Sequence, residues 1–115
     1  MSAQAVSVLT LPVTATGTVN AARFVTPGGA QAGADANTLG VSRFAGVAGD
    51  KLAVDVLGTA PVEAGAAIAA GATLKSDASG RAITWASSGA KVAIALEAAG
   101  AAGQVIEVML IPNAA

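Results

Sequence analysis

Histidine, cysteine and tyrosine are all absent from this sequence. Without histidine, neither a Ser-His-Asp nor a Cys-His catalytic arrangement can form, and histidine metal sites are excluded as well. Without cysteine there are no disulfides, zinc thiolate sites or thiol nucleophiles, so packing alone must stabilise the fold. We therefore predict a protein with no catalytic residue, no metal site, no cofactor and no small-molecule substrate.

Charge is scarce too, since charged residues make up 11% of the chain and the net charge at pH 7 is −1. Such a surface offers no basic field for phosphates or anionic lipids, so we predict neither nucleic acid nor a membrane as a partner. Polar residues also interrupt every apolar run before it reaches the roughly 20 residues of a membrane span. The first basic residue is Arg23, so no secretory signal is predicted and assembly inside a cell is expected.

The 14 glycines are the main signal for secondary structure. Alanine favours helices, but a glycine every few residues interrupts almost every window long enough for a stable helix. At 115 residues the chain has the length of one domain. We therefore predict an all-β fold, a small single-domain β-sandwich or β-barrel of short strands with glycine-rich turns.

Alternation of apolar and polar residues places the two clearest strands. In residues 51–56 the even positions are expected to point inward and the odd positions, including Asp55, outward. In residues 91–97 the side chains expected to point inward are Val92, Ile94 and Leu96. Each strand is therefore predicted to cover the core with one face.

Six further strands complete the predicted fold. Residues 104–111 are apolar on nearly both faces, as in a central strand, and Pro112 ends that strand. The other five are predicted at residues 6–11, 17–26, 38–44, 72–75 and 81–85. Ser, Asp and Gly in segments 75–81 and 46–50 predict hairpin turns, while 27–29 and 33–37 are predicted to form a surface loop.

Two weak patterns could carry chemistry. The 7 carboxylates are scattered along the chain, so a hydrolase with a carboxylate pair assembled by folding remains an alternative. The residues from Ser88 to Lys91 match the SxxK pattern of Ser/Lys acyl enzymes. That mechanism needs a helix, whereas this segment leads into a predicted strand, so we interpret the match as chance.

Two Arg-Phe pairs are the first candidates for contact residues, because interfaces favour guanidinium and aromatic anchors. They are Arg23-Phe24 and Arg43-Phe44, each at the end of a predicted strand. Trp85 is interpreted either as a core residue or as a residue at a rim or interface.

The order of several short segments resembles a family of head decoration proteins of tailed bacteriophages, also called capsid cement proteins. The resemblance covers about residues 11–112, and its segments are TATG (14–17), RFV (23–25), GAQAG (29–33), LGV (39–41), GD (49–50), VLGTA (56–60), VEAG (62–65), SDASGR (76–81) and a closing VIEV.

The resemblance implies a mainly β structural protein without catalytic residues. Such a protein is made in the bacterial cytoplasm of the host and binds, as a dimer or trimer, to the outside of an icosahedral head. There it would contact the major capsid protein and cement neighbouring subunits of the mature capsid. The alternative that the sequence leaves open is a phage tail, baseplate or surface β-domain that binds a host component.

The resemblance also implies an N-terminal arm that adds to a strand of the capsid protein. Residues 1–10 are expected to form this arm, and residues 11–115 are expected to form a single β decoration domain. The residues expected to contact the capsid or another subunit are Ser2, Ala3, Gln4, Val6, Val8, Arg23, Phe24, Arg43, Phe44 and Trp85.

Overall fold

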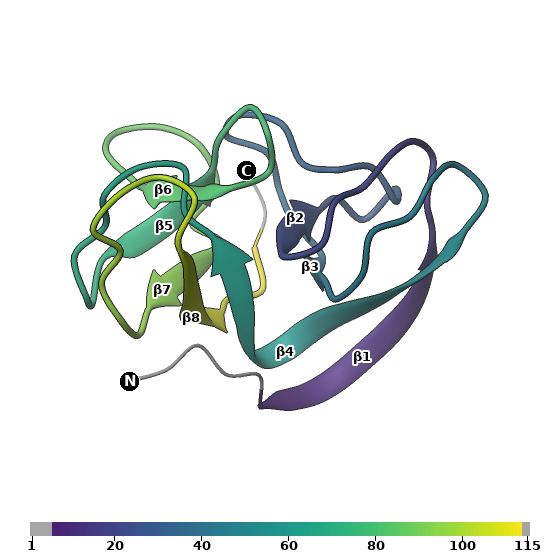
Figure 1. The fold of residues 1–115 in the computed structure, drawn as a ribbon, viewed down its shortest axis with the longest axis horizontal. Helices are drawn as coiled ribbons and strands as arrows, with labels where there is room; N and C mark the ends of the chain where they lie inside the picture. The colour runs from purple at the N-terminus through teal and green to yellow at the C-terminus, as the bar shows by residue number, and fades with distance from the viewer. Residues whose placement is uncertain (1–5, 114–115) are drawn as a thin grey trace.

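The computed structural model describes residues 6–113, and within them all regular secondary structure is β (Figure 1). No helix in this part of the chain has the length and hydrophobicity needed to cross a bilayer. The strands are β1 (Ser7–Thr14), β2 (Arg23–Val25), β3 (Gly40–Ser42), β4 (Lys51–Glu63), β5 (Thr73–Ser76), β6 (Ala82–Thr84), β7 (Ala93–Ala95) and β8 (Val105–Leu110).

The strands form one sheet in the order β2-β3-β4-β8-β7-β5-β6, with β1 paired to β4 outside this path. All named strand pairs are antiparallel. A bridge between Ala64, just after β4, and Ala82 of β6 brings the two ends of the β4-β8-β7-β5-β6 segment together. The sheet is therefore nearly closed and barrel-like, which confirms the predicted all-β class.

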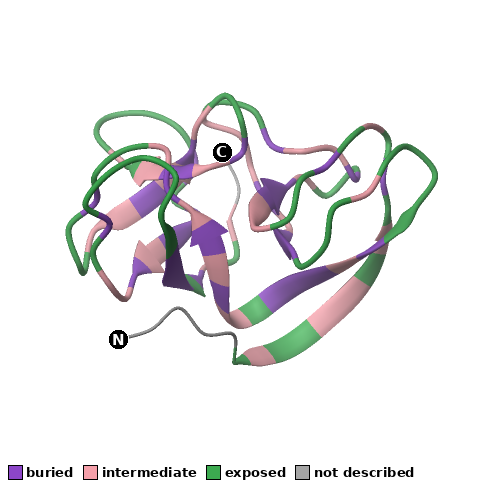
Figure 2. Ribbon diagram, viewed as in Figure 1, coloured by how far each residue is buried: buried purple, intermediate pink, exposed green. Residues whose placement is uncertain are grey.

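The hydrophobic interior consists of two clusters. Figure 2 shows buried residues on β4 and in the strands of the nearly closed part of the sheet. The larger cluster fills the nearly closed part of the sheet and contains Phe24, Leu74 and Val108. The smaller cluster lies along β1 and the first half of β4 and contains Val19, Val25 and Val54. Both clusters use mainly valine and alanine, as expected of a chain with 3% aromatic residues.

Strand β4 connects the two clusters and is longer than predicted. The sequence predicted a strand that ends at residue 56, but β4 continues through Gly58 and Pro61 to Glu63. Gly58 has φ +98° and pairs with Ser7 beside an irregularity in the β1–β4 register. The main chain of Val6 lies so close that a Cβ at residue 58 would overlap its carbonyl. Glycine here allows the strand to bend at a bulge and continue, instead of ending it.

All eight predicted strands are present, and the hairpin turns at 46–50 and 75–81 are confirmed by the antiparallel β3–β4 and β5–β6 pairs. The strand predicted at 17–26 is wrong for most of its length, because only Arg23–Val25 is a strand. Residues before it follow an irregular path, held by an isolated bridge between Val19 and Gly46.

The expected side-chain directions are wrong at two places. Asp55 was expected to point to solvent but is buried, because it lies under Arg43 and Thr10. In β7 the buried residues are Ala93 and Ala95, whereas Ile94 of β7 and the following Leu96 are only half-buried. The interior of a small, nearly closed sheet has little room, so the smaller residues occupy the inner face.

The expected N-terminal arm overlaps the sheet. Residues 7–10 of the predicted arm belong to β1, and Ser7, Leu9 and Thr10 pair with β4. Sheet pairing thus begins at Ser7, within the strand predicted at residues 6–11.

Candidate docking surface

Several large exposed apolar residues lie on or next to β1, β4 and β8, where these strands pair. Leu9 of β1 lies directly opposite Leu57 of β4, and both are exposed. The Val6 carbonyl accepts a hydrogen bond from the Thr59 amide, and Thr59 lies opposite the exposed Met109 of β8. We call the set Val6, Val8, Leu9, Leu57 and Met109 the apolar patch.

Strand β1 is an edge strand. Among the described residues its only partner strand is β4, and Figure 1 shows it on the outside of the fold. Pro12 lies within β1, a position that proline tolerates mainly on an edge. The side chain of Val8 on this strand is 74% exposed. An exposed edge with apolar side chains is a template for pairing with another chain.

Two of the predicted contact residues, Val6 and Val8, belong to the apolar patch, while Ser2, Ala3 and Gln4 lie outside the described residues. Sequence reasoning missed Leu9, Leu57 and Met109. Leu57 stands beside Gly58 in a stretch that was not assigned to a strand. Met109 belongs to a strand that was expected to be buried on both faces, although Val105 and Met109 are exposed.

The pair Arg43-Phe44 borders a pocket of about 370 Å³. Phe44 is exposed, whereas the Arg43 Nε donates a hydrogen bond to Oδ1 of the buried Asp55 over 2.8 Å. The Thr10 hydroxyl donates to the same oxygen over 2.8 Å. The remaining lining residues are Ala21, Ala22, Val41, Ser42 and Pro61.

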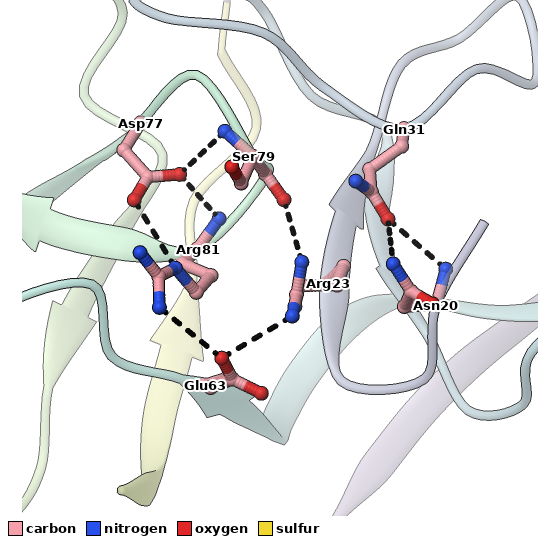
Figure 3. A network of polar contacts seen from close by, with 7 residues as sticks. All are labelled: Asn20, Arg23, Gln31, Glu63, Asp77, Ser79 and Arg81. Atoms are coloured by element: carbon pink, nitrogen blue, oxygen red, sulfur yellow. Dashed lines mark hydrogen bonds and ion pairs between the residues drawn. The ribbon is translucent and has the colours of Figure 1, made fainter. Parts of the chain in front are cut away.

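The pair Arg23-Phe24 contributes to the fold itself. Phe24 is fully buried in the larger cluster, so its side chain is not on the surface and we remove it from the contact residues. Arg23 donates to Oε2 of Glu63 and to the Ser79 carbonyl (Figure 3). Arg81 also pairs with Glu63, which places two guanidinium groups around one carboxylate oxygen.

A separate part of the same view shows Gln31, whose Oε1 accepts hydrogen bonds from the backbone amide and the side-chain amide of Asn20 (Figure 3). This contact fastens the irregular segment before β2 to the loop that follows it.

Trp85 is half-buried after β6, and its Nε1 donates to the Gly89 carbonyl over 3.0 Å. The Lys91 ammonium lies 4.5 Å from the centre of the Trp85 ring, a cation–π contact. The Ser88 hydroxyl instead donates to Asp35. The SxxK residues therefore contact separate partners, and the serine is not paired with the lysine.

The acidity of Asp35 is shifted by a neighbouring ammonium group. The Lys75 ammonium lies 2.7 Å from Oδ1 of Asp35, and its hydrogen bond lowers the pKa of that carboxyl below the ordinary value. Across residues 6–113 no three acidic side chains come together as a possible metal site.

Comparison with known proteins supports a phage origin for this fold. A family model described as phage cement protein matches residues 3–110. No curated protein matches the chain. Among solved structures, the chain is similar to the head fibre gp8.5 N base of bacteriophage phi29, with a TM-score of 0.73 and 20% identity. The alignment covers 93% of this chain and 97% of the phi29 chain.

Proposed function

The chain belongs to the phage cement protein family, and we propose that it binds the outer surface of the mature icosahedral head and holds neighbouring major capsid protein subunits together. The observation that carries this proposal is the edge strand β1 with the apolar patch beside it. The similarity to a base domain of a phage head fibre is consistent with a head-bound role.

In this proposal a strand of the major capsid protein pairs with the free edge of β1. Main-chain hydrogen bonds then supply affinity, and the patch supplies apolar burial. Ser2, Ala3 and Gln4, which precede β1 in the chain, extend the contact in the N-terminal direction. The interface buries on the order of 1,200 to 2,000 Å² in total, the usual size for a specific complex.

Stabilisation of the head follows from linkage. A protein that binds the expanded lattice but not its dissociated subunits shifts the equilibrium toward the lattice. We propose that the chain acts on the head as a dimer or trimer, as its resemblance to head decoration proteins implies. Contacts to two capsid subunits then strengthen attachment, because the second contact is effectively intramolecular.

The test is to mix purified protein with undecorated heads and to count bound copies by cryo-electron microscopy. Ordered density on the outside of the lattice, with β1 against the capsid protein, is the expected result. Val8→Lys should reduce occupancy at least roughly ten-fold, because a lysine on an edge strand opposes strand pairing.

The matched control is Val47→Lys. Val47 is also exposed but lies in the β3–β4 turn, away from the apolar patch. This variant should decorate heads as well as the wild type does. An equal loss of bound copies in both variants would contradict the proposal, and so would a lattice without added density. Pairing of β1 between two copies of this chain would instead show in the map as contact within the oligomer.

A further inference from the structure

The backbone groups of alternate β1 residues point toward its free edge. The Ala15 amide donates to the Asp50 carbonyl over 2.8 Å, so the backbone of Ala15 faces the β4 side. In an antiparallel pair the N–H and C=O groups of one residue face the same side, and that side alternates along the strand. The backbone groups of Thr10, Pro12 and Thr14 therefore point away from β4.

A turn covers the last of these positions. Residues 26–30 form the turn, and Gly29 within it is buried. Gly29 has φ +93°, and a Cβ there would overlap the Thr14 carbonyl, so the turn lies directly against the free edge. The Gly29 carbonyl also accepts a hydrogen bond from the Thr16 amide, the next outward-facing position, over 3.1 Å. An added strand cannot occupy the edge at Thr14 or Thr16 while this turn is in place.

Pro12 lies at the boundary of the stretch that stays open. Its nitrogen carries no hydrogen, so it offers a partner strand no donor. The open groups are the amide and carbonyl of Thr10 and the carbonyl of Pro12, and in residues 6–113 no backbone group outside β4 bonds to them. A strand that pairs here must bring two N–H donors, two residues apart, for these two carbonyls.

The other two edge strands are covered. In β2 the Phe24 amide donates to the Gly80 carbonyl over 2.8 Å, and the Phe24 carbonyl accepts from the Ala32 amide over 2.9 Å. In β6 the Ala82 carbonyl accepts from the Gly65 amide over 2.8 Å. Within the described part of the chain, β1 is thus the edge strand left open. An open edge can pair with further copies of the same chain as well as with a partner.

We infer that Pro12 and the turn at residues 26–30 confine the major capsid protein to a short strand that pairs with β1 no further than Pro12, and that Gly29 closes the edge beyond it. The inference rests on the proposed function, because it takes the added strand to come from the capsid protein. The same boundary restricts pairing between copies of this chain, since two copies share a shorter edge.

The map of decorated heads tests the boundary directly. The expected result is a capsid strand beside Thr10 and Pro12, with the turn still against Thr14. A capsid strand that continues beside Thr14, with the turn displaced, would overturn the inference and leave the cement function standing. Heads without added density would refute the cement function, and the association of free copies then decides whether the boundary exists.

Gly29→Ala should open the edge in the free protein. The added Cβ displaces the turn from Thr14, so hydrogen exchange at the Thr16 amide should become at least roughly ten-fold faster. Copies of this variant should also associate more strongly in sedimentation experiments. Gly28→Ala is the matched control, because the nearest atom to a Cβ there is the Thr26 hydroxyl at 3.9 Å. Faster exchange without any gain in association would overturn the role of Gly29.

Pro12→Val tests the boundary independently, also where Gly29→Ala unfolds. Valine restores an outward N–H group and leaves the hydrogen bonds to β4 intact, so two copies paired through β1 would gain one donor each. Their association constant should rise at least roughly ten-fold in sedimentation experiments. Pro112→Val, at an exposed proline beyond β8, should leave this constant unchanged. Equal association of the wild type and Pro12→Val would refute the blocking role of Pro12.

Discussion

Arg23 of β2 donates a hydrogen bond to Glu63 at the end of β4, with 3.2 Å between Nη2 and Oε2. Arg23 lies next to Phe24 of the larger cluster, and β4 runs between both clusters. This ion pair therefore ties the irregular N-terminal half of the chain to the nearly closed half of the sheet. Arg81, after the β5–β6 turn, shares the same oxygen over 3.5 Å.

Glu63→Ala should lower the free energy of unfolding by about 1–2 kcal/mol, because two partly buried guanidinium groups lose their acceptor while solvent screens part of the effect. Urea unfolding followed by tryptophan fluorescence measures the change. Glu63→Gln keeps an acceptor oxygen and should lose less. An alanine variant as stable as the wild type would show that the ion pairs contribute nothing.

Gly40→Ala should destabilise the fold by about 1–3 kcal/mol through overpacking. A Cβ at residue 40 would overlap the main-chain carbonyl of Asp55, so β3 would have to move away from β4. Gly17→Ala is the matched control, because a Cβ there meets no atom within 4 Å. Thermal unfolding compares the two variants, and an equal melting temperature for both would contradict the close approach of β3 and β4.

The Asp35–Lys75 ion pair predicts a pH dependence of stability. The pKa of Asp35 is lower in the folded chain than its ordinary value of 3.8, so the folded state binds this proton less readily than the unfolded state does. The contribution of this ion pair to the free energy of unfolding is therefore fully present above pH 3.8. It is lost as the pH falls through the lowered pKa of Asp35 in the folded chain.

Lys75→Met should flatten this dependence, so that the variant loses less stability than the wild type between about pH 5 and pH 2. Lys51→Met is the control, because the Lys51 ammonium contacts the Thr14 hydroxyl and forms no ion pair with a carboxylate of residues 6–113. Urea unfolding at several pH values measures both slopes. Parallel curves for the wild type and Lys75→Met would show that the pair does not act as described.

Asn113→Ala should release the C-terminal segment from the residues that precede β3. The Asn113 side chain accepts a hydrogen bond from the Thr38 amide over 2.8 Å and donates to the Thr38 carbonyl over 3.0 Å. Thr38 is buried, so its unpaired groups should cost about 1–3 kcal/mol. Hydrogen exchange at the Thr38 amide measures the loss, while Asn20→Ala, at an exposed side-chain pair, should leave that exchange rate unchanged.

Much of the fold could be predicted because local chemistry and the final structure agree. Residues 51–56 alternate as a half-buried strand does, and Ser, Asp and Gly at 76–80 specify the turn before β6. The segment order also predicted the family that the comparison shows.

The candidate site was predicted only in part. Val8 was expected in a short strand and as a contact residue of an arm, and it lies beside Leu9 in the edge strand β1. Phe24 and Phe44 look alike in the sequence, yet Phe24 is buried while Phe44 borders a pocket. A short motif does not determine burial, because burial depends on which distant segments cover the residue.

The sequence by itself determined the secondary-structure class, the turns and the absence of histidine and cysteine chemistry, since these depend on residue types and their local spacing. The tertiary structure alone decided that β4 continues past Gly58, that Ala93 points inward instead of Ile94, and that Asp55 is buried with one oxygen unpaired. Those outcomes depend on the volume available inside a nearly closed sheet and on contacts between residues far apart in the chain, such as Thr10 and Asp55.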